Sequence, residues 1–167
     1  MAISLTAYNK TALNFNFTDS DTQSTNSAGS EIVSTYTYGT GDFQAEAGVY
    51  ITGLLPSGGT VELDLTQVPE VFFGVDGTVQ YSGIKFIGLG NASTVENYNM
   101  TITASGQYGL SWLFNDNSGN IMIKPYSTFS YNDPYAGLPT SVTNKKIQIN
   151  DMGSGALYTI TILGTLQ

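Results

Sequence analysis

Apolar and polar residues alternate one by one in short runs along most of this chain. The clearest runs are Ala12–Thr18, Thr60–Leu65 and Ala156–Leu163. Side chains of a β-strand point alternately to its two faces, so a two-residue period is typical of strands with one buried face. No stretch keeps an apolar 3.6-residue period over three helical turns. The pattern therefore predicts an all-β protein.

Aromatic and β-branched residues cluster between groups of Gly, Asn, Asp, Ser and Pro, which are turn formers. We expect strands at Ile3–Tyr8, Ala12–Thr18, Glu31–Tyr38, Ala45–Leu55, Thr60–Leu65, Ser82–Gly88, Asn97–Ala104, Leu110–Phe114, Asn120–Tyr126, Lys145–Asn150 and Ala156–Leu163. We expect the strands Ala45–Leu55 and Thr60–Leu65 to pair with each other as a hairpin around the turn Pro56–Gly59. Gln67–Val75 is ambiguous between strand and loop, and its Pro69 and Gly74 favour a loop.

About ten short strands at even spacing predict two antiparallel sheets packed as a sandwich. We expect one domain that covers residues 1–167, with a jelly-roll-like topology, because 167 residues can bury a core without metals or disulfides. One stretch interrupts the pattern: the residues at about 19–30 are almost all polar. This stretch is expected to be a loop or a mobile arm that orders on a partner.

Three residue types are missing: the chain has no Cys, no His and no Arg. The cations are Lys10, Lys85, Lys124, Lys145 and Lys146, and the formal net charge is −8. Without His and Cys the chain lacks the usual proton-transfer, nucleophilic and thiolate groups, so we expect no enzyme and no cofactor. A net negative charge disfavours binding to nucleic acid or to an anionic membrane.

Nothing in the sequence predicts a membrane span, because no run of about 18 apolar residues occurs. Met1–Leu5 has neither a basic region nor a long apolar run, so no signal peptide is expected.

Two groups of acidic or amide side chains could carry chemistry. The pairs Asp19/Asp21 and Glu62/Asp64 are each two residues apart, and two carboxyls about 5–10 Å apart are the minimum for a glycosidase. We interpret the first pair as a solvated loop and the second as a solvated strand face. Asn115–Asn120 offers oxygen ligands for calcium but lacks the acids of an EF-hand, which favours a turn. We therefore assign no catalytic, cofactor-binding or metal site.

Aromatic side chains offer the strongest competing function. Tyrosines are frequent on sugar-binding surfaces and in protein interfaces alike. The candidates are Tyr36, Tyr38, Tyr126, Tyr131 and Tyr135, three of them in the aromatic stretch Tyr126–Tyr135. The four Asn-x-Ser/Thr sequons, at Asn9, Asn16, Asn91 and Asn99, are close to the about three expected by chance and carry no information.

Three strand-and-turn segments lie in the two-thirds of the chain from about residue 50 onward. They are Leu63-Asp64-Leu65, Lys146-Ile147-Gln148-Ile149-Asn150 and Tyr158-Thr159-Ile160-Thr161-Ile162-Leu163-Gly164-Thr165. In the order of these segments the chain resembles a family of small tailed-phage virion proteins: head decoration or cement proteins and related minor structural proteins. The chain departs from the family pattern at Lys124-Pro125-Tyr126-Ser127, where a pair of glycines is missing.

The resemblance implies a jelly-roll-like sandwich that decorates or cements a bacteriophage capsid. Its implied partners are the major capsid protein and further copies of itself in a dimer or trimer. The implied location is the surface of the phage head, after synthesis in the host cytoplasm. The alternative is a carbohydrate- or receptor-binding module of a phage tail fibre.

Overall fold

The structure, a computed structural model of the chain, describes residues 6–19, 24–72, 75–104, 119–153 and 155–167. Strands β1–β14 account for all of the regular structure in these ranges. They are β1 (Thr6–Asp19), β2 (Ser24–Tyr38), β3 (Gln44–Ala45), β4 (Ala47–Leu54), β5 (Thr60–Asp64), β6 (Val68–Phe72), β7 (Val75–Val79), β8 (Tyr81–Asn91), β9 (Met100–Ala104), β10 (Asn120–Ile123), β11 (Thr128–Asn132), β12 (Leu138–Pro139), β13 (Lys146–Asp151) and β14 (Leu157–Leu166). Over the same ranges, no helix is long and apolar enough to cross a membrane.

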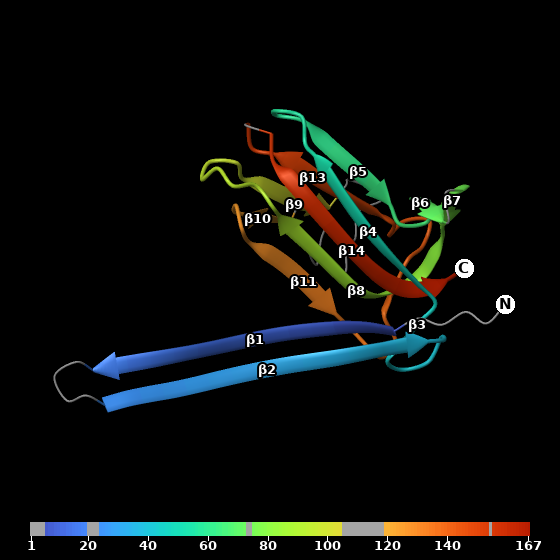
Figure 1. Cartoon of the computed structure of the whole chain (residues 1–167). Helices are drawn as coiled ribbons and strands as arrows, with labels where there is room; N and C mark the ends of the chain where they lie inside the picture. Colours follow the sequence, from blue (N-terminus) through green and yellow to red (C-terminus); the bar gives the residue numbers. More distant parts are fainter. Residues whose placement is uncertain (1–5, 20–23, 73–74, 105–118, 154) are drawn as a thin grey trace.

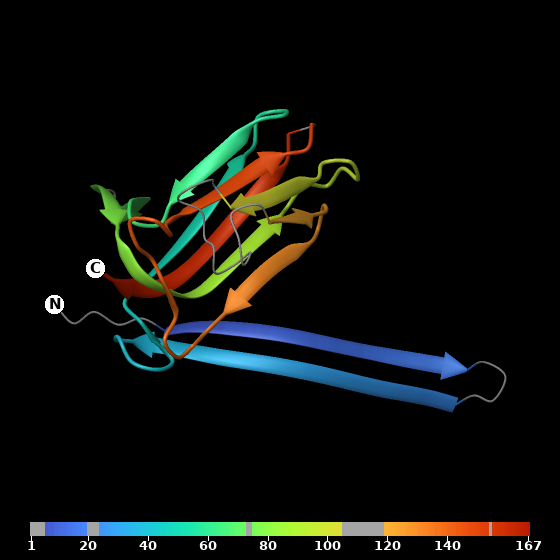
Figure 2. The same cartoon turned by 180° about the vertical axis from the view of Figure 1, so that it is seen from behind.

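The body of the molecule is a sandwich of two antiparallel sheets (Figures 1 and 2). One sheet has the strand order β11-β8-β14-β4, with β12 paired to β8, and the other has the order β10-β9-β13-β5. The chain changes sheets six times: between β4 and β5, β5 and β8, β8 and β9, β10 and β11, β11 and β13, and β13 and β14. Eight strands connected in this way form a jelly roll. The predicted all-β, jelly-roll-like sandwich is confirmed.

The hydrophobic core lies between the two sheets, as the alternation of side chains predicts. In the central strand of each sheet, every second residue is buried; Ile147 and Ile149 come from β13, and Ile160 and Ile162 come from β14. Leu63 of β5 also points inward, as expected. The period of two therefore located the core correctly in these strands.

The expected hairpin around Pro56–Gly59 is wrong. The turn exists, since the Gly59 N–H donates to the Pro56 carbonyl at 2.7 Å. However, β4 pairs with β14 and β5 pairs with β13, so the turn connects the two sheets. A two-residue period shows which face of a strand is buried but not which strand lies beside it, and here both partners come from the end of the chain.

The expected loop at Gln67–Val75 is also wrong. Strands β6 and β7 pair as a small two-stranded ribbon at the edge of the sandwich, with Pro69 opposite Thr78. Proline lacks an N–H and is excluded from central strands, but a strand with one partner can place it on its unpaired edge.

Strands β1 and β2 form a long antiparallel ribbon, which we call the N-terminal ribbon, and the expected loop at 19–30 is only partly present. Residues 24–30 belong to β2 and pair with residues 13–19 of β1. The two strands expected in residues 3–18 are one continuous strand over the described residues. Sequence periodicity does not detect β2 in its polar half because cross-strand backbone pairing, rather than a hydrophobic face, defines it.

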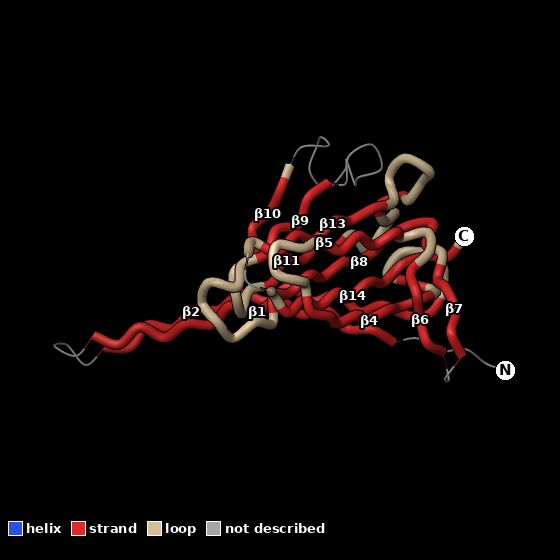
Figure 3. The backbone as a smooth tube through the Cα atoms, turned by 90° about the horizontal axis from the view of Figure 1, so that it is seen from above, coloured by secondary structure: helices blue, strands red, loops and turns tan. Residues whose placement is uncertain are grey.

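The N-terminal ribbon runs out past the sandwich (Figures 1 and 3). Its strands contain 14 and 15 residues, which at about 3.3 Å per residue corresponds to a length of about 45 Å. Its base pairs in parallel with β3, which leads directly into β4. The expected strand at Leu110–Phe114 lies outside the described residues.

The base of the ribbon packs on the outer face of the β11-β8-β14-β4 sheet. Tyr36 and Ala45 are buried there against Leu163 of β14 and Phe86 of β8. The register between β8 and β14 changes at this point: Leu163 is opposite Phe86, but Gly164 is opposite Ile84. The residue in between, Lys85, therefore has no partner across the pair and forms a β-bulge, which reorients its side chain.

Lys85 is the buried cation of this junction, only 2% exposed. Its ammonium donates to the backbone carbonyls of Tyr135 and Gly41, the latter at 3.4 Å. The Tyr36 hydroxyl donates to the Lys85 carbonyl at 3.2 Å and to the Asn132 side chain. The bulge residue Lys85 thus links three segments of the chain, at Tyr36, Gly41 and Tyr135.

Burial, with a smaller contribution from nearby Asp133, raises the pKa of Tyr36 to about 12. The hydroxyl is therefore protonated at neutral pH and acts as a donor in this junction.

The substitution Lys85→Met tests the junction. Methionine keeps much of the aliphatic chain but leaves two carbonyls without their donor, so we expect a loss of about 1–3 kcal/mol in unfolding free energy. Urea unfolding measures this loss, and hydrogen exchange should increase at residues 36–45. The matched exposed substitution Lys124→Met should stay within about 0.5 kcal/mol of wild type. Equal stability of the two variants would contradict the assignment.

Candidate functional site

Four connections between the sheets gather at one end of the sandwich, away from the base of the ribbon (Figure 1). We call this the loop end, made of the described residues 55–59, 92–99, 124–127, 152–153 and 155–156. In jelly rolls and other sandwiches, binding residues are commonly found in loops that a rigid scaffold holds in place. The loop end is therefore the first place to look for a site.

Asp151 joins two of these connections. Its Oδ2 accepts backbone N–H bonds from Gly58 at 2.8 Å, Gly153 at 2.8 Å and Gly155 at 2.9 Å. Its Oδ1 accepts a fourth from Ala156 at 3.1 Å. Burial alone raises the pKa of this carboxyl, but the four backbone donors outweigh burial and lower it below 3.8. Asp151 is thus an ionised link between the β4–β5 and β13–β14 connections.

Asn91 joins the other two connections. Its side-chain amide donates to the carbonyls of Tyr98 at 2.6 Å and Ile123 at 3.1 Å, and its Oδ1 accepts from the Ser93 N–H. The Ser93 hydroxyl in turn accepts from the Leu157 N–H at 2.8 Å. Asn91 and Ser93 are both buried, so these bonds hold the loops in a low-dielectric environment. The loop end is consequently built on a preorganised backbone.

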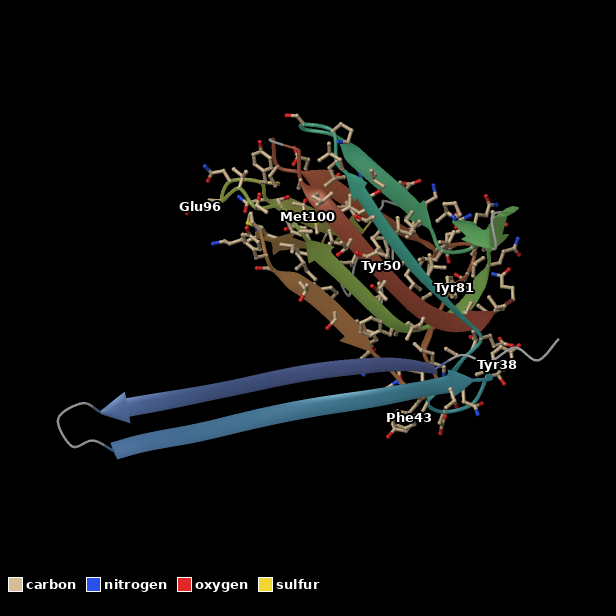
Figure 4. All side chains as sticks on the ribbon, in the orientation of Figure 1. Tyr38, Phe43, Tyr50, Tyr81, Glu96 and Met100 are labelled. Atoms are coloured by element: carbon tan, nitrogen blue, oxygen red, sulfur yellow. The ribbon has the colours of Figure 1, made fainter. Side chains whose placement is uncertain are left out.

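Two shallow hollows open on either side of the 92–99 loop, and both include Thr94. The larger has a volume of about 280 Å³ and is lined by Thr94, Glu96, Lys124, Pro125 and Tyr126. The smaller, about 190 Å³, is lined by Leu54, Ala92, Ser93, Thr94, Val95, Tyr98, Gly155 and Leu157. Figure 4 shows Glu96 at the extremity of the loop end. Both hollows are lined mainly by apolar surface, but the larger also includes two charged side chains, Glu96 and Lys124, whereas the smaller includes none.

The predicted pair Glu62/Asp64 forms ion pairs on the outer face of its sheet. Lys145 lies 2.9 Å from Asp64, and Lys146 pairs with Glu62. Burial raises the pKa of Asp64, but hydrogen bonds from Thr66 and Lys145 lower it overall. A general acid of a glycosidase needs a raised pKa, so this arrangement supports the interpretation as a strand face.

The other oxygen-rich candidates are not brought together in the described residues. Asp19 ends β1, while Asp21 and residues 115–118 of the predicted turn Asn115–Asn120 lie outside the described residues. Within the described ranges, no three acidic side chains gather closely enough to hold a metal ion.

The five tyrosines do not form one site. Tyr36 is buried at the ribbon base, and Tyr131 packs against the core from β11. Tyr38 is exposed near the ribbon base, as Figure 4 shows. Tyr135 contacts Phe43 edge-on there, with ring centroids 5.2 Å apart. Only Tyr126 belongs to the loop end. The aromatic stretch Tyr126–Tyr135 contains a strand, β11.

Sequence reasoning missed Asp151, Asn91 and Glu96 as parts of this end. Asp151 had a readable signal, since an aspartate followed by glycines at 153 and 155 is typical of a side chain that caps its own turn. Glu96 had none, because only the fold places it beside Tyr126.

No protein-family model matches the sequence, and no curated protein sequence matches it. Among solved structures, the chain is similar to the Yersinia pseudotuberculosis-derived mitogen, with 14% identity and a TM-score of 0.38, over 71% of this chain and 86% of that one. It is also similar to PirA, with 15% identity and a TM-score of 0.35, over 68% of this chain and 92% of that one. At these scores the two likenesses carry no inference about function. The strand order places this protein in the fold class of jelly-roll sandwiches.

The substitution Asp151→Asn tests the loop-end link. An amide cannot supply two anionic acceptors, so we expect a loss of about 2–3 kcal/mol in unfolding free energy at pH 7. Because the folded pKa is lowered, the wild-type advantage is complete above pH 3.8 and declines as the pH falls through the folded pKa.

Urea unfolding from pH 7 down to pH 2.5 measures this advantage. The exposed control Asp42→Asn should behave like wild type throughout. An advantage that is independent of pH would show that the carboxylate charge is not responsible.

Proposed function

We propose that this chain is a virion structural protein that decorates or cements a bacteriophage capsid through protein–protein contacts. The observation that carries the proposal is the N-terminal ribbon, which is about 45 Å long and extends beyond the sandwich. The major capsid protein is the proposed partner, and the proposed location is the head surface. The resemblance of residues from about 50 onward to phage decoration proteins is a separate line of support.

A two-stranded ribbon by itself is only marginally stable in water. Over the described residues, β1 pairs with β2 alone, so its outer edge presents backbone groups that can pair with another chain. Adding a strand to such an edge is a common mode of protein recognition. The ribbon is suited to lie across a neighbouring subunit of the shell and gain its stability there.

The rigid connection between ribbon and sandwich also supports this role. Lys85 and Tyr36 join the base of the ribbon to β8 with buried hydrogen bonds. A ribbon clamped at one end transmits load between the partner and the sandwich. We propose that copies of the chain associate as a dimer or trimer at capsomer junctions, where several such contacts add together.

Cryo-electron microscopy of the phage particle tests the location. We expect density for the sandwich at repeated lattice points of the shell, with the ribbon in contact with the major capsid protein. Density on the tail would instead favour the receptor-binding module of a tail fibre. If mass spectrometry does not detect the chain in purified particles, both interpretations are wrong.

Removal of the outer ribbon tests the mechanism. Residues 9–34 are replaced by Asn-Gly, which joins Tyr8 to its cross-strand partner Thr35 through a tight turn. The sandwich and its junction remain, so we expect the melting temperature to change by less than about 4 °C. Binding to phage heads that lack this gene product should fall at least tenfold in cosedimentation.

The control for this experiment is Tyr50→Ala, which removes an exposed side chain from β4 and leaves the ribbon intact. It should bind the heads like wild type. If the shortened ribbon binds equally well, the ribbon is not the docking element.

A further inference from the structure

Tyr126 occupies a backbone position where glycine is normally favoured. The Ser127 N–H donates to the Lys124 carbonyl at 3.1 Å, which closes a β-turn with Pro125 second and Tyr126 third. Tyr126 has a φ of 59°, in the left-handed region. Turns with proline second and positive φ third usually have glycine in the third position. A bulky residue in this conformation strains the backbone locally.

The surrounding structure holds Tyr126 in this conformation. The Tyr126 N–H donates to the Asn91 carbonyl at 2.9 Å, and the Asn91 N–H donates to the Ser127 carbonyl at 2.9 Å. Asn91 is itself buried and bonded through its side chain. The turn therefore presents the residue at its tip in one fixed direction.

Packing of the ring does not offset the strain. The Tyr126 side chain is 75% exposed. Phe43, the other non-glycine residue with positive φ in the described ranges, differs because its ring packs edge-on against Tyr135. A strained backbone that displays an aromatic ring to solvent, with no gain from burial, is the pattern of a binding residue.

The chemistry around the ring limits the class of ligand. Thr94, Glu96 and Lys124 line the hollow of about 280 Å³ together with Tyr126, so residues that carry a hydroxyl, a carboxylate and an ammonium group accompany one phenol ring. A pyranose has one face of C–H groups that can stack on an aromatic ring, and a rim of hydroxyls that donate and accept hydrogen bonds. The volume is close to the lower limit of about 300 Å³ for small-molecule pockets, which favours a short saccharide.

We propose that the loop end of this chain binds a pyranose sugar. Tyr126 is the stacking platform, Glu96 accepts from sugar hydroxyls, and Lys124 and Thr94 complete the polar rim. A protein partner is less well matched, because the cores of protein interfaces are depleted in Lys and Glu. This site is distinct from the ribbon, so it would give a capsid-bound protein a second activity, attachment to a glycan.

The primary test is an array of defined pyranose oligosaccharides and bacterial surface polysaccharides, probed with the full chain. Saturation-transfer NMR with the methyl glycosides of glucose, galactose and mannose complements the array. We expect wild type to bind a restricted set of glycans, with the sugar C–H protons of one ring face in contact with the protein. If neither the array nor the NMR experiment detects a bound sugar, the proposal is overturned.

Substitution of Tyr126 separates binding from folding. Tyr126→Gly removes the ring and relieves the strain, so binding should fall at least tenfold while the melting temperature stays the same or rises. Tyr126→Phe keeps the ring and should retain binding within about threefold. Glu96→Gln should weaken binding about tenfold. Tyr50→Ala, which removes a tyrosine of similar exposure from outside the hollow, is the control and should bind normally.

Other outcomes decide against the site or against the ligand class. Equal losses in Tyr126→Gly and Tyr50→Ala would indicate nonspecific adhesion and overturn the proposal. Weaker binding of Tyr126→Gly to phage heads, without glycan binding by wild type, would assign the loop end to a protein partner instead. The chain with the shortened ribbon should still bind the glycan, so failure of the capsid proposal and failure of this one are distinguishable.

Discussion

The jelly roll depends on the connections that join its two sheets at the loop end. The buried carboxylate of Asp151 provides much of that closure, because four backbone N–H groups from two connections converge on its two oxygens. Asn91, which donates to two carbonyls, and Ser93, which accepts from a distant N–H, serve the remaining connections. Buried polar groups stabilise a structure only when they are satisfied, and here the partners are backbone groups of the nearby turns together with three from distant parts of the chain, at Gly58, Ile123 and Leu157.

A rigid loop end and a projecting ribbon divide the molecule into two kinds of surface. The loop end presents fixed side chains, including a tyrosine on a strained turn. The N-terminal ribbon presents backbone along an unpaired edge. Lys85 connects the N-terminal ribbon to the sandwich through a β-bulge. A local irregularity in β8 thus positions Tyr36 of the ribbon, which lies almost fifty residues earlier in the chain. The proposed capsid contact and the proposed sugar site are therefore structurally independent.

Much of the sandwich could be predicted, because burial of one strand face leaves an alternating pattern in residues such as Ile147, Ile149 and Leu63. The polar half of β2 could not, since its pairing with β1 leaves no hydrophobic period. The site was predicted only in part. Tyr126 was one of five candidate aromatics, but its exposure, its positive φ and its neighbour Glu96 follow from the fold. The predicted phage family stays a prediction.

The residues alone predict that the chain is all-β and which face of most strands is buried, and they exclude His, Cys and Arg from any function. These properties are local or compositional, so no partner strand is needed to infer them. The assignment of β4 and β5 to different sheets, and of Asp151 and Lys85 as buried links, comes from the folded structure. The folded structure also decided that Tyr126 alone of the candidate tyrosines reaches the loop end. Such features depend on contacts between residues far apart in the chain, and alternation along one strand carries no information about them.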